Sequence, residues 1–152
     1  MKNLDCHTVK GRKFIDAQYD TTDILKRLYP SLIFIHSKND SQAEDCYIYH
    51  NKELSGVAEI KCRPYINRRD KVPYLLETIK SRYNNEYLIT KTKIDNLRAI
   101  SLKKLIPSFI FLNLPSEKKI VRFKITDKEG KWTIPVAFLP LDSSAVKVVS
   151  YC

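Results

Sequence analysis

The sequence predicts a mixed α/β domain built on a central β-sheet, and three observations support this prediction. With 152 residues, 43% of them hydrophobic and 29% charged, the chain has the size and composition of one globular domain with its own core. Short runs rich in β-branched and aromatic residues recur along it, which is typical of strands. Two segments between these runs have the apolar spacing of a helix, and each ends at a proline.

The first half of the chain predicts one helix and then three strands. The helix is expected at residues 21–30, where Thr21 or Thr22 can cap its first turn and Pro30 ends it. The polar segment 51–55 separates the second strand from the third. The three strands are expected at residues 31–37, 45–50 and 56–62.

The second half predicts one further helix and a strand-rich end. Residues 63–86 are mostly irregular and basic. The helix is expected at residues 92–106, with Thr92 and Asp95 as its capping box and Pro107 as its end. Further strands are expected at residues 86–90, 108–114, 119–126, 132–139 and 145–151.

The chain carries a net charge of +10, from 27 lysine and arginine residues against 17 acidic ones. A basic excess of this size favours a polyanionic partner, because each neutralised phosphate releases counterions; a solvated basic surface is the alternative. The three glycines cannot be assembled into a phosphate-binding loop, and the four cysteines and three histidines have no zinc spacing. With no signal peptide and no membrane span in the sequence, we expect a cytoplasmic protein with free thiols.

The third predicted strand, GVAEIKC, carries a carboxylate and an ammonium group side by side. Because side chains alternate along a strand, we expect Glu59 and Lys61 on one face, with Ala58, Ile60 and Cys62 on the other. A Glu-x-Lys triplet is weak by itself, since chance gives roughly one in a chain of this composition. The sequence contains three, and this one alone lies inside an apolar strand, whereas the other two lie in predicted turns.

A hairpin between the second and third strands would bring a second carboxylate to this face. If the loop has three residues, His50 opposes Leu54 and Asp45 opposes Glu59. Two carboxylates about 5 Å apart repel unless a cation lies between them, and Mg²⁺ accepts two such oxygens together with several waters. Lys61 would then lie beside that cation, where it can orient an attacking water or offset charge on a phosphate. A one-residue change of register would remove the arrangement.

Asp45, followed by EIK on an apolar strand within the order α-β-β-β-α-β, resembles the PD-(D/E)XK nuclease superfamily. The closest likeness is to its small phage-type members, which read EIKCR at the third strand. The resemblance covers about residues 20–126 and implies a single nuclease-like domain over residues 1–152. Its fold would be a restriction-endonuclease-like αβββαβ core with a mixed central sheet, extended by β-strands over residues 127–152. It implies a Mg²⁺- or Mn²⁺-dependent endonuclease or exonuclease, in the host cytoplasm if the chain is phage-encoded.

The resemblance also implies roles for single residues. Asp45 and Glu59 would be metal ligands, the backbone carbonyl of Ile60 a further ligand, and Lys61 the catalytic lysine. Lys93 matches the place, on the helix after the third strand, where members often add a catalytic polar residue. A lysine in the first turn of a helix is otherwise simply solvated.

Two features depart from the usual pattern of the superfamily. Many members carry an acidic residue on the first helix, for which this sequence offers only Asp16, Asp20 and Asp23. The proline that usually precedes the first acidic ligand is replaced by Glu44.

A basic segment with a tyrosine follows directly after the third strand. Arginine and lysine suit phosphates and tyrosine can stack on a base, so we expect a nucleic-acid contact loop here; a solvated basic loop is the alternative. The residues concerned are Arg63, Tyr65, Arg68, Arg69 and Lys71.

Two functions from different classes fit these observations. The first is a metal-dependent nuclease that hydrolyses phosphodiester bonds, in DNA rather than RNA. The alternative is a catalytically inactive nuclease-like module that binds nucleic acid or protein. An intact set of Asp, Glu and Lys favours the enzyme, because a pure binder gains nothing from opposed carboxylates that face a phosphate. A basic inhibitor or structural protein with an acidic protein partner is a third hypothesis, and the sequence leaves open whether a homodimer forms.

Overall fold

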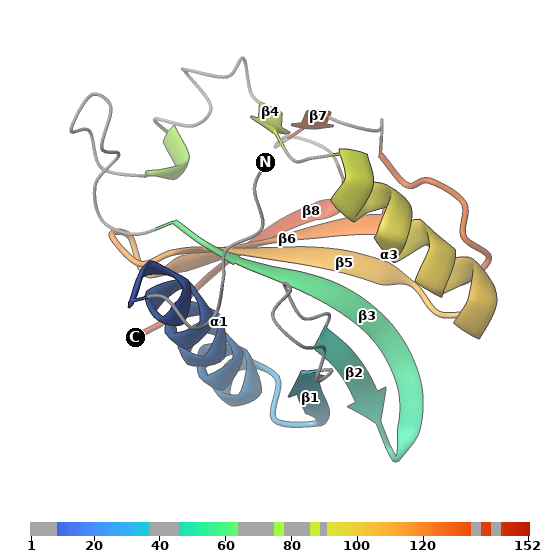
Figure 1. The fold of residues 1–152 in the computed structure, drawn as a ribbon, viewed down its shortest axis with the longest axis horizontal. Coiled ribbons are helices and arrows are strands. Elements are labelled where there is room, and N and C mark those ends of the chain that lie inside the picture. Colours follow the sequence, from blue (N-terminus) through green and yellow to red (C-terminus); the bar gives the residue numbers. More distant parts are fainter. Residues whose placement is uncertain are drawn as a thin grey trace.

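A central six-stranded sheet with one helix on each face forms the framework of this computed structural model (Figure 1). The structure describes residues 9–36, 46–63, 75–77, 86–88, 91–134, 138–140 and 144–152. The helices are α1 (Val9–Leu28) and α3 (Lys91–Lys104). The prediction of an α/β protein on a mixed central sheet is confirmed.

The central sheet has the strand order β1-β2-β3-β5-β6-β8, in which β3 and β5 are parallel and all other neighbours antiparallel. A second, two-stranded sheet pairs β4 with β7, so the segment before α3 and the segment after β6 meet there. The strands are β1 (Leu32–His36), β2 (Cys46–His50), β3 (Glu53–Cys62), β4 (Glu86–Leu88), β5 (Ser108–Leu114), β6 (Lys119–Thr126), β7 (Phe138–Pro140) and β8 (Val146–Ser150).

Each face of the sheet has its own hydrophobic cluster. Leu25 of α1 packs with Ala58 and Ile60 of β3, while Leu97 of α3 packs on the other side with Val57. Successive side chains of β3 therefore point alternately into the two hydrophobic clusters, as expected for a strand buried on both faces. This alternation places Glu59 and Lys61 on one face of the strand, as predicted, and the structure shows that this face is the α3 side of the sheet. Neither helix in the described part of the chain is long and apolar enough to cross a membrane.

The β2–β3 hairpin differs from the prediction at its turn. Asn51 and Lys52 form a two-residue turn in which both have positive φ, as a type I′ turn requires, so His50 pairs with Glu53 and not with Leu54. Ser55 is then an additional residue on β3, in a bulge that shifts the register by one. Beyond the bulge the register is again the predicted one.

The helix starts also differ from the prediction. Helix α1 begins at Val9, so Thr21 and Thr22 lie inside it, buried, and cap nothing at its start. Helix α3 begins at Lys91, so Thr92 is within the helix and the predicted capping box is wrong. Each helix ends two residues before its predicted end, α1 at Leu28 and α3 at Lys104, and a proline follows within three residues in both cases.

At the end of α3, Leu105 takes a positive φ of 57°, and its N–H donates to the carbonyl of Ser101. Three of the strands predicted in the second half lie where they were expected, within one residue at each end: β5, β6 and β8. The strand predicted at residues 132–139 is found only in part: Trp132 forms an isolated bridge with Thr126, and Phe138 and Leu139 belong to the short strand β7. Residues 135–137 lie outside the described part of the chain.

Candidate functional site

Glu59 is a carboxylate buried inside the sheet. It lies on β3 with 1% of its surface exposed, and its parallel partner on β5 is the fully buried Ile110. Unpaired carboxylates are seldom found in such surroundings, because the charged form loses its hydration. The position therefore requires compensation by cations.

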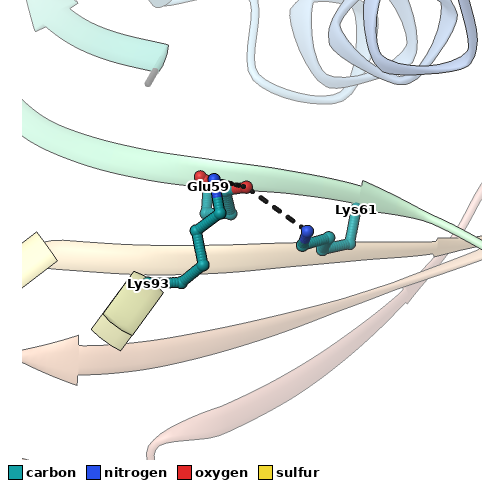
Figure 2. Close-up of polar contacts among 3 residues, drawn as sticks. All are labelled: Glu59, Lys61 and Lys93. Carbon is teal, nitrogen blue, oxygen red and sulfur yellow. Dashed lines mark ion pairs between the residues drawn. The ribbon is translucent and has the colours of Figure 1, made fainter. Parts of the chain in front are cut away.

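Two lysines provide this compensation (Figure 2). Lys61 Nζ lies 3.5 Å from Glu59 Oε1, and Lys93 Nζ lies 3.6 Å from the same oxygen. Lys61 comes from the same face of β3, two residues further on. Lys93 reaches in from the first turn of α3, where the neighbouring Ile94 is fully buried and anchors the helix on the sheet. The structure thus brings together three of the predicted site residues.

Glu59 Oε1 is held by charge more than by hydrogen bonds. Ammonium–carboxylate hydrogen bonds are usually about 2.7–2.9 Å long, and both lysine nitrogens lie further away than that. Among the described residues, this oxygen is a buried acceptor without a hydrogen-bond partner. Such an oxygen is a ligand that a hard cation such as Mg²⁺ accepts.

Burial also affects the ammonium group of Lys61. It lowers the pKa of Lys61 below 10.5; the charge of Glu59 opposes this, and the charges of Lys93 and Arg63 add to it. Lys61 and Lys93 thus place two cations beside the one carboxylate of Glu59, and Arg63 lies close enough to Lys61 to affect its pKa. The local excess of positive charge suits an anion such as a phosphate.

The backbone of β3 shows which way the Ile60 carbonyl points. The N–H groups of Val57 and Arg63 donate to carbonyls of the β5 side, those of Pro107 and Asn113. In a parallel ladder the N–H and C=O of one residue bond to the same neighbouring strand, so the odd-numbered residues of β3 bond to β5. The Ile60 carbonyl therefore points to the β2 side of the strand.

Asp45, the second expected metal ligand, lies outside the described residues. Its neighbour Cys46 pairs with Ala58, which is the register on which the prediction for Asp45 depends. Within the described part of the chain, no group of three or more His, Cys, Asp or Glu side chains gathers to hold a metal ion.

The other predicted site residues divide between described and undescribed positions. Of the basic contact loop, Arg63 is described and half-buried at the end of β3. Tyr65, Arg68, Arg69 and Lys71 lie outside the described residues.

The aspartates considered for the first helix all lie on α1, which packs on the face of β3 opposite to Glu59. Asp20 and Asp23 are exposed, and the side chain of Asp16 is outside the described part. Burial raises the pKa of Cys62 despite a hydrogen bond with Thr21, and the charge of Asp20 raises it further. Asp20 therefore lies near Cys62, on the α1 side.

The two other Glu-x-Lys triplets are surface features, as predicted. Lys119 Nζ lies 3.6 Å from Glu117 Oε1, but these side chains are 34% and 21% exposed. The carboxylate of Glu117 also accepts the Leu76 N–H at 2.7 Å. Glu129 and Lys131 are exposed in a turn.

A buried polar network on the α1 side was not predicted. Asn113 of β5 donates to Thr21 Oγ1 at 3.0 Å, and its Oδ1 accepts the hydroxyl of Tyr151 at 2.7 Å. The network joins α1, the central sheet and the end of the chain. A single amide inside the apolar run SFIFLNL is the signal that could have indicated it.

Neither a protein-family model, nor a curated protein, nor a solved structure matches this chain.

Proposed function

We propose that the protein is a metal-dependent nuclease that hydrolyses phosphodiester bonds in DNA. The observation that carries the proposal is the buried carboxylate of Glu59 between Lys61 and Lys93, on one face of the sheet. A carboxylate in this position is costly to bury, and a stable fold needs no charge there. Metal-assisted attack on a phosphate does need such a group.

The arrangement of elements supports a restriction-endonuclease-like core of the PD-(D/E)XK type. Helix α1, the antiparallel strands β1 to β3, helix α3 and strands β5 and β6 follow in the expected order. The helix between β3 and β5 makes these two strands parallel neighbours, as a crossover connection requires.

The residues that would hold Mg²⁺ or Mn²⁺ are Asp45, Glu59 and the carbonyl of Ile60. Two observations support this set: Glu59 Oε1 is a buried acceptor without a hydrogen-bond partner among the described residues, and the Ile60 carbonyl points to the β2 side. The proposal requires the ladder at Cys46 and Ala58 to continue by one pair, which would set Asp45 opposite Glu59. A bound cation would lower the pKa of a water molecule and neutralise charge on the phosphate.

Lys61 and Lys93 have complementary roles in this proposal. Lys61 orients the attacking water and offsets the negative charge that develops on the phosphate. Lys93 stabilises the same charge from the helix side. Because Lys61 is largely buried, its ammonium group is poorly hydrated, which lowers its pKa. Water therefore screens its charge only weakly.

One experiment tests the activity directly. The protein is incubated with labelled duplex, single-stranded and branched DNA, and with RNA, in the presence of Mg²⁺, Mn²⁺ or EDTA. We expect cleavage of DNA with either metal and none with EDTA. No cleavage of any substrate under any metal condition would contradict the proposal.

A second candidate is supported by one observation, the excess of cations around Glu59. Lys61 and Lys93 both lie beside the carboxylate of Glu59, an arrangement with one positive charge in excess that would bind a phosphate without a metal ion. The protein would then be a nuclease-like module that binds nucleic acid without cutting it. Binding that is unaffected by EDTA, together with absent cleavage, would favour this candidate.

A homodimer, a cytoplasmic location and a preference for DNA over RNA remain predictions of the nuclease proposal. Sedimentation equilibrium of the purified chain would test the first of these. Competition between matched DNA and RNA strands would test the preference.

A further inference from the structure

A group of basic side chains lies on the α1 side of β6 and β8. Ile120 of β6 belongs to the cluster around α1, so Arg122 and Lys124, two and four residues further on, point to the same side. Lys147 of β8 is the cross-strand partner of Arg122. We call Arg122, Lys124 and Lys147 the basic sheet face.

Two of these cations oppose each other directly. Arg122 and Lys147 are Cα partners in the β6–β8 ladder, and like charges at such positions destabilise a sheet. No described carboxylate forms an ion pair with any of the three residues. The arrangement therefore costs stability, and no ion pair among the described residues offsets it.

The Arg122 guanidinium lies over an aromatic ring, and its Nε donor has no described hydrogen-bond acceptor. Its guanidinium lies over the ring of Phe109, 5.9 Å from the ring centroid. Its Nε is buried and has no hydrogen-bond partner among the described residues. A guanidinium is a planar group of donors that suits an oxyanion, and this one lies over an aromatic ring.

Neither described helix neutralises the basic sheet face. Helix α1 packs mainly against β1 and β3, and α3 packs on the opposite face. Lys147 is exposed on β8, the edge strand of the sheet. Arg122 and Lys124 are half-buried.

We propose that the basic sheet face binds the sugar–phosphate backbone of a nucleic acid. The charge of the occupant follows from three uncompensated cations in a chain with a net charge of +10, because binding to phosphates, which releases counterions, offsets the repulsion among them. This surface lies on the side of the sheet opposite to Glu59. It is a second binding region, independent of the proposed chemistry, and it holds whether or not the protein cuts DNA.

The test compares two triple variants from which the same amount of charge is removed. One changes the basic sheet face, as Arg122→Gln, Lys124→Gln and Lys147→Gln. The matched control changes three exposed lysines elsewhere, as Lys26→Gln, Lys103→Gln and Lys128→Gln. Fluorescence anisotropy with labelled duplex and single-stranded DNA, in EDTA and across a salt series, gives affinity without cleavage. Thermal unfolding shows that both variants are folded.

We expect the basic-face variant to bind at least about tenfold more weakly than the control. We also expect its log–log salt slope on duplex DNA to fall by about 0.9 for each phosphate that the variant no longer neutralises. Equal reductions of affinity in the two triple variants would overturn the proposal, since charge alone would then explain them. Displacement of the DNA by polyglutamate as effectively as by unlabelled DNA would also overturn it, in favour of an acidic protein partner.

The Arg122→Lys variant separates geometry from charge. It should keep part of the affinity, because the charge remains while the planar donor group is absent. The binding assay is run in EDTA, so it measures affinity without any metal-dependent cleavage. The nuclease proposal and the basic sheet face can therefore fail independently.

Discussion

The ammonium nitrogen of Lys61 lies 3.5 Å from Oε1 of Glu59, inside a sheet and on the face covered by α3 (Figure 2). The carboxylate is 1% exposed and the lysine side chain 18%. Buried ion pairs are poor sources of stability, because the loss of hydration offsets most of their mutual attraction. The fold therefore gains little from this pair, and the proposed nuclease chemistry would account for its presence.

The stability of an apolar variant tests this explanation. Replacing Glu59, Lys61 and Lys93 together with methionine removes all three charges at similar volume. We expect the free energy of unfolding to stay the same or to rise by about 1–4 kcal/mol, as for other buried ion pairs replaced by apolar residues. Glu59→Met alone should lower it, because both lysines are then without their partner. Urea denaturation measures both values, and a large decrease in the triple variant would mean that the charges are structural.

The lowered pKa of Lys61 predicts how stability depends on pH. The folded protein releases this proton at a lower pH than the unfolded chain, where the pKa is about 10.5. In the window between the two values the unfolded chain binds more protons, so stability rises with pH there. In EDTA, the free energy of unfolding of wild type relative to Lys61→Met should therefore increase from neutral pH to about pH 10.5. A difference that stays flat or decreases would contradict the pKa shift.

Those parts of the fold that depend on local sequence were predicted well. Strands β5 and β6 have the expected bounds because Pro107 precedes one and the turn at residues 115–118 separates the two. The start of α1 was missed because residues 9–20 lack a clear apolar period. Thr21 resembles a cap in sequence, but in the structure it is a buried partner of Asn113, a contact between residues far apart in the chain.

The turn after β6 provides a prediction about the backbone. Gly130 has a φ of +77°, and a Cβ placed there would lie 2.6 Å from Cγ of Leu102 on α3. Gly130→Ala should cost about 1–3 kcal/mol, since both the backbone and the neighbouring side chain must adjust. Lys128→Ala in the same turn is the matched control and should change stability by less than about 0.5 kcal/mol. Equal midpoints for the two variants in urea would show that the turn tolerates a side chain.

The Asn113 network predicts a coupling between β5 and the end of the chain. Tyr151→Phe removes one hydrogen bond and should cost about 1 kcal/mol. Asn113→Ala should cost about 2–3 kcal/mol, because it leaves both Thr21 and Tyr151 without this partner inside the protein. The double variant should cost less than the sum of the two single ones. Additive costs would show that the two hydrogen bonds act independently.

The candidate site was predictable in part, because strand alternation alone puts Glu59 and Lys61 on one face. The predicted pairing of β2 with β3 was correct from Ile48 back to Cys46, but for a reason that the sequence does not reveal. A two-residue turn shifts the pairing by one and the bulge at Ser55 shifts it back. Positive φ at Lys52 is unusual for a lysine, so the turn could not be predicted from residue preferences. The basic sheet face was missed because its members come from two strands that meet only in the folded sheet.

The central claim, that Lys61 acts in catalysis beside Glu59, is tested most directly by the cleavage rate of Lys61→Ala. Lys119→Ala is the matched control, since Lys119 lies 3.6 Å from a glutamate two residues away but in a more exposed pair. With Mg²⁺ and labelled DNA, we expect the rate of Lys61→Ala to fall by about 10²–10³ while DNA affinity falls only modestly. Lys119→Ala should cleave as wild type does. Wild-type cleavage that survives in Lys61→Ala would contradict the claim and place the chemistry elsewhere in the chain.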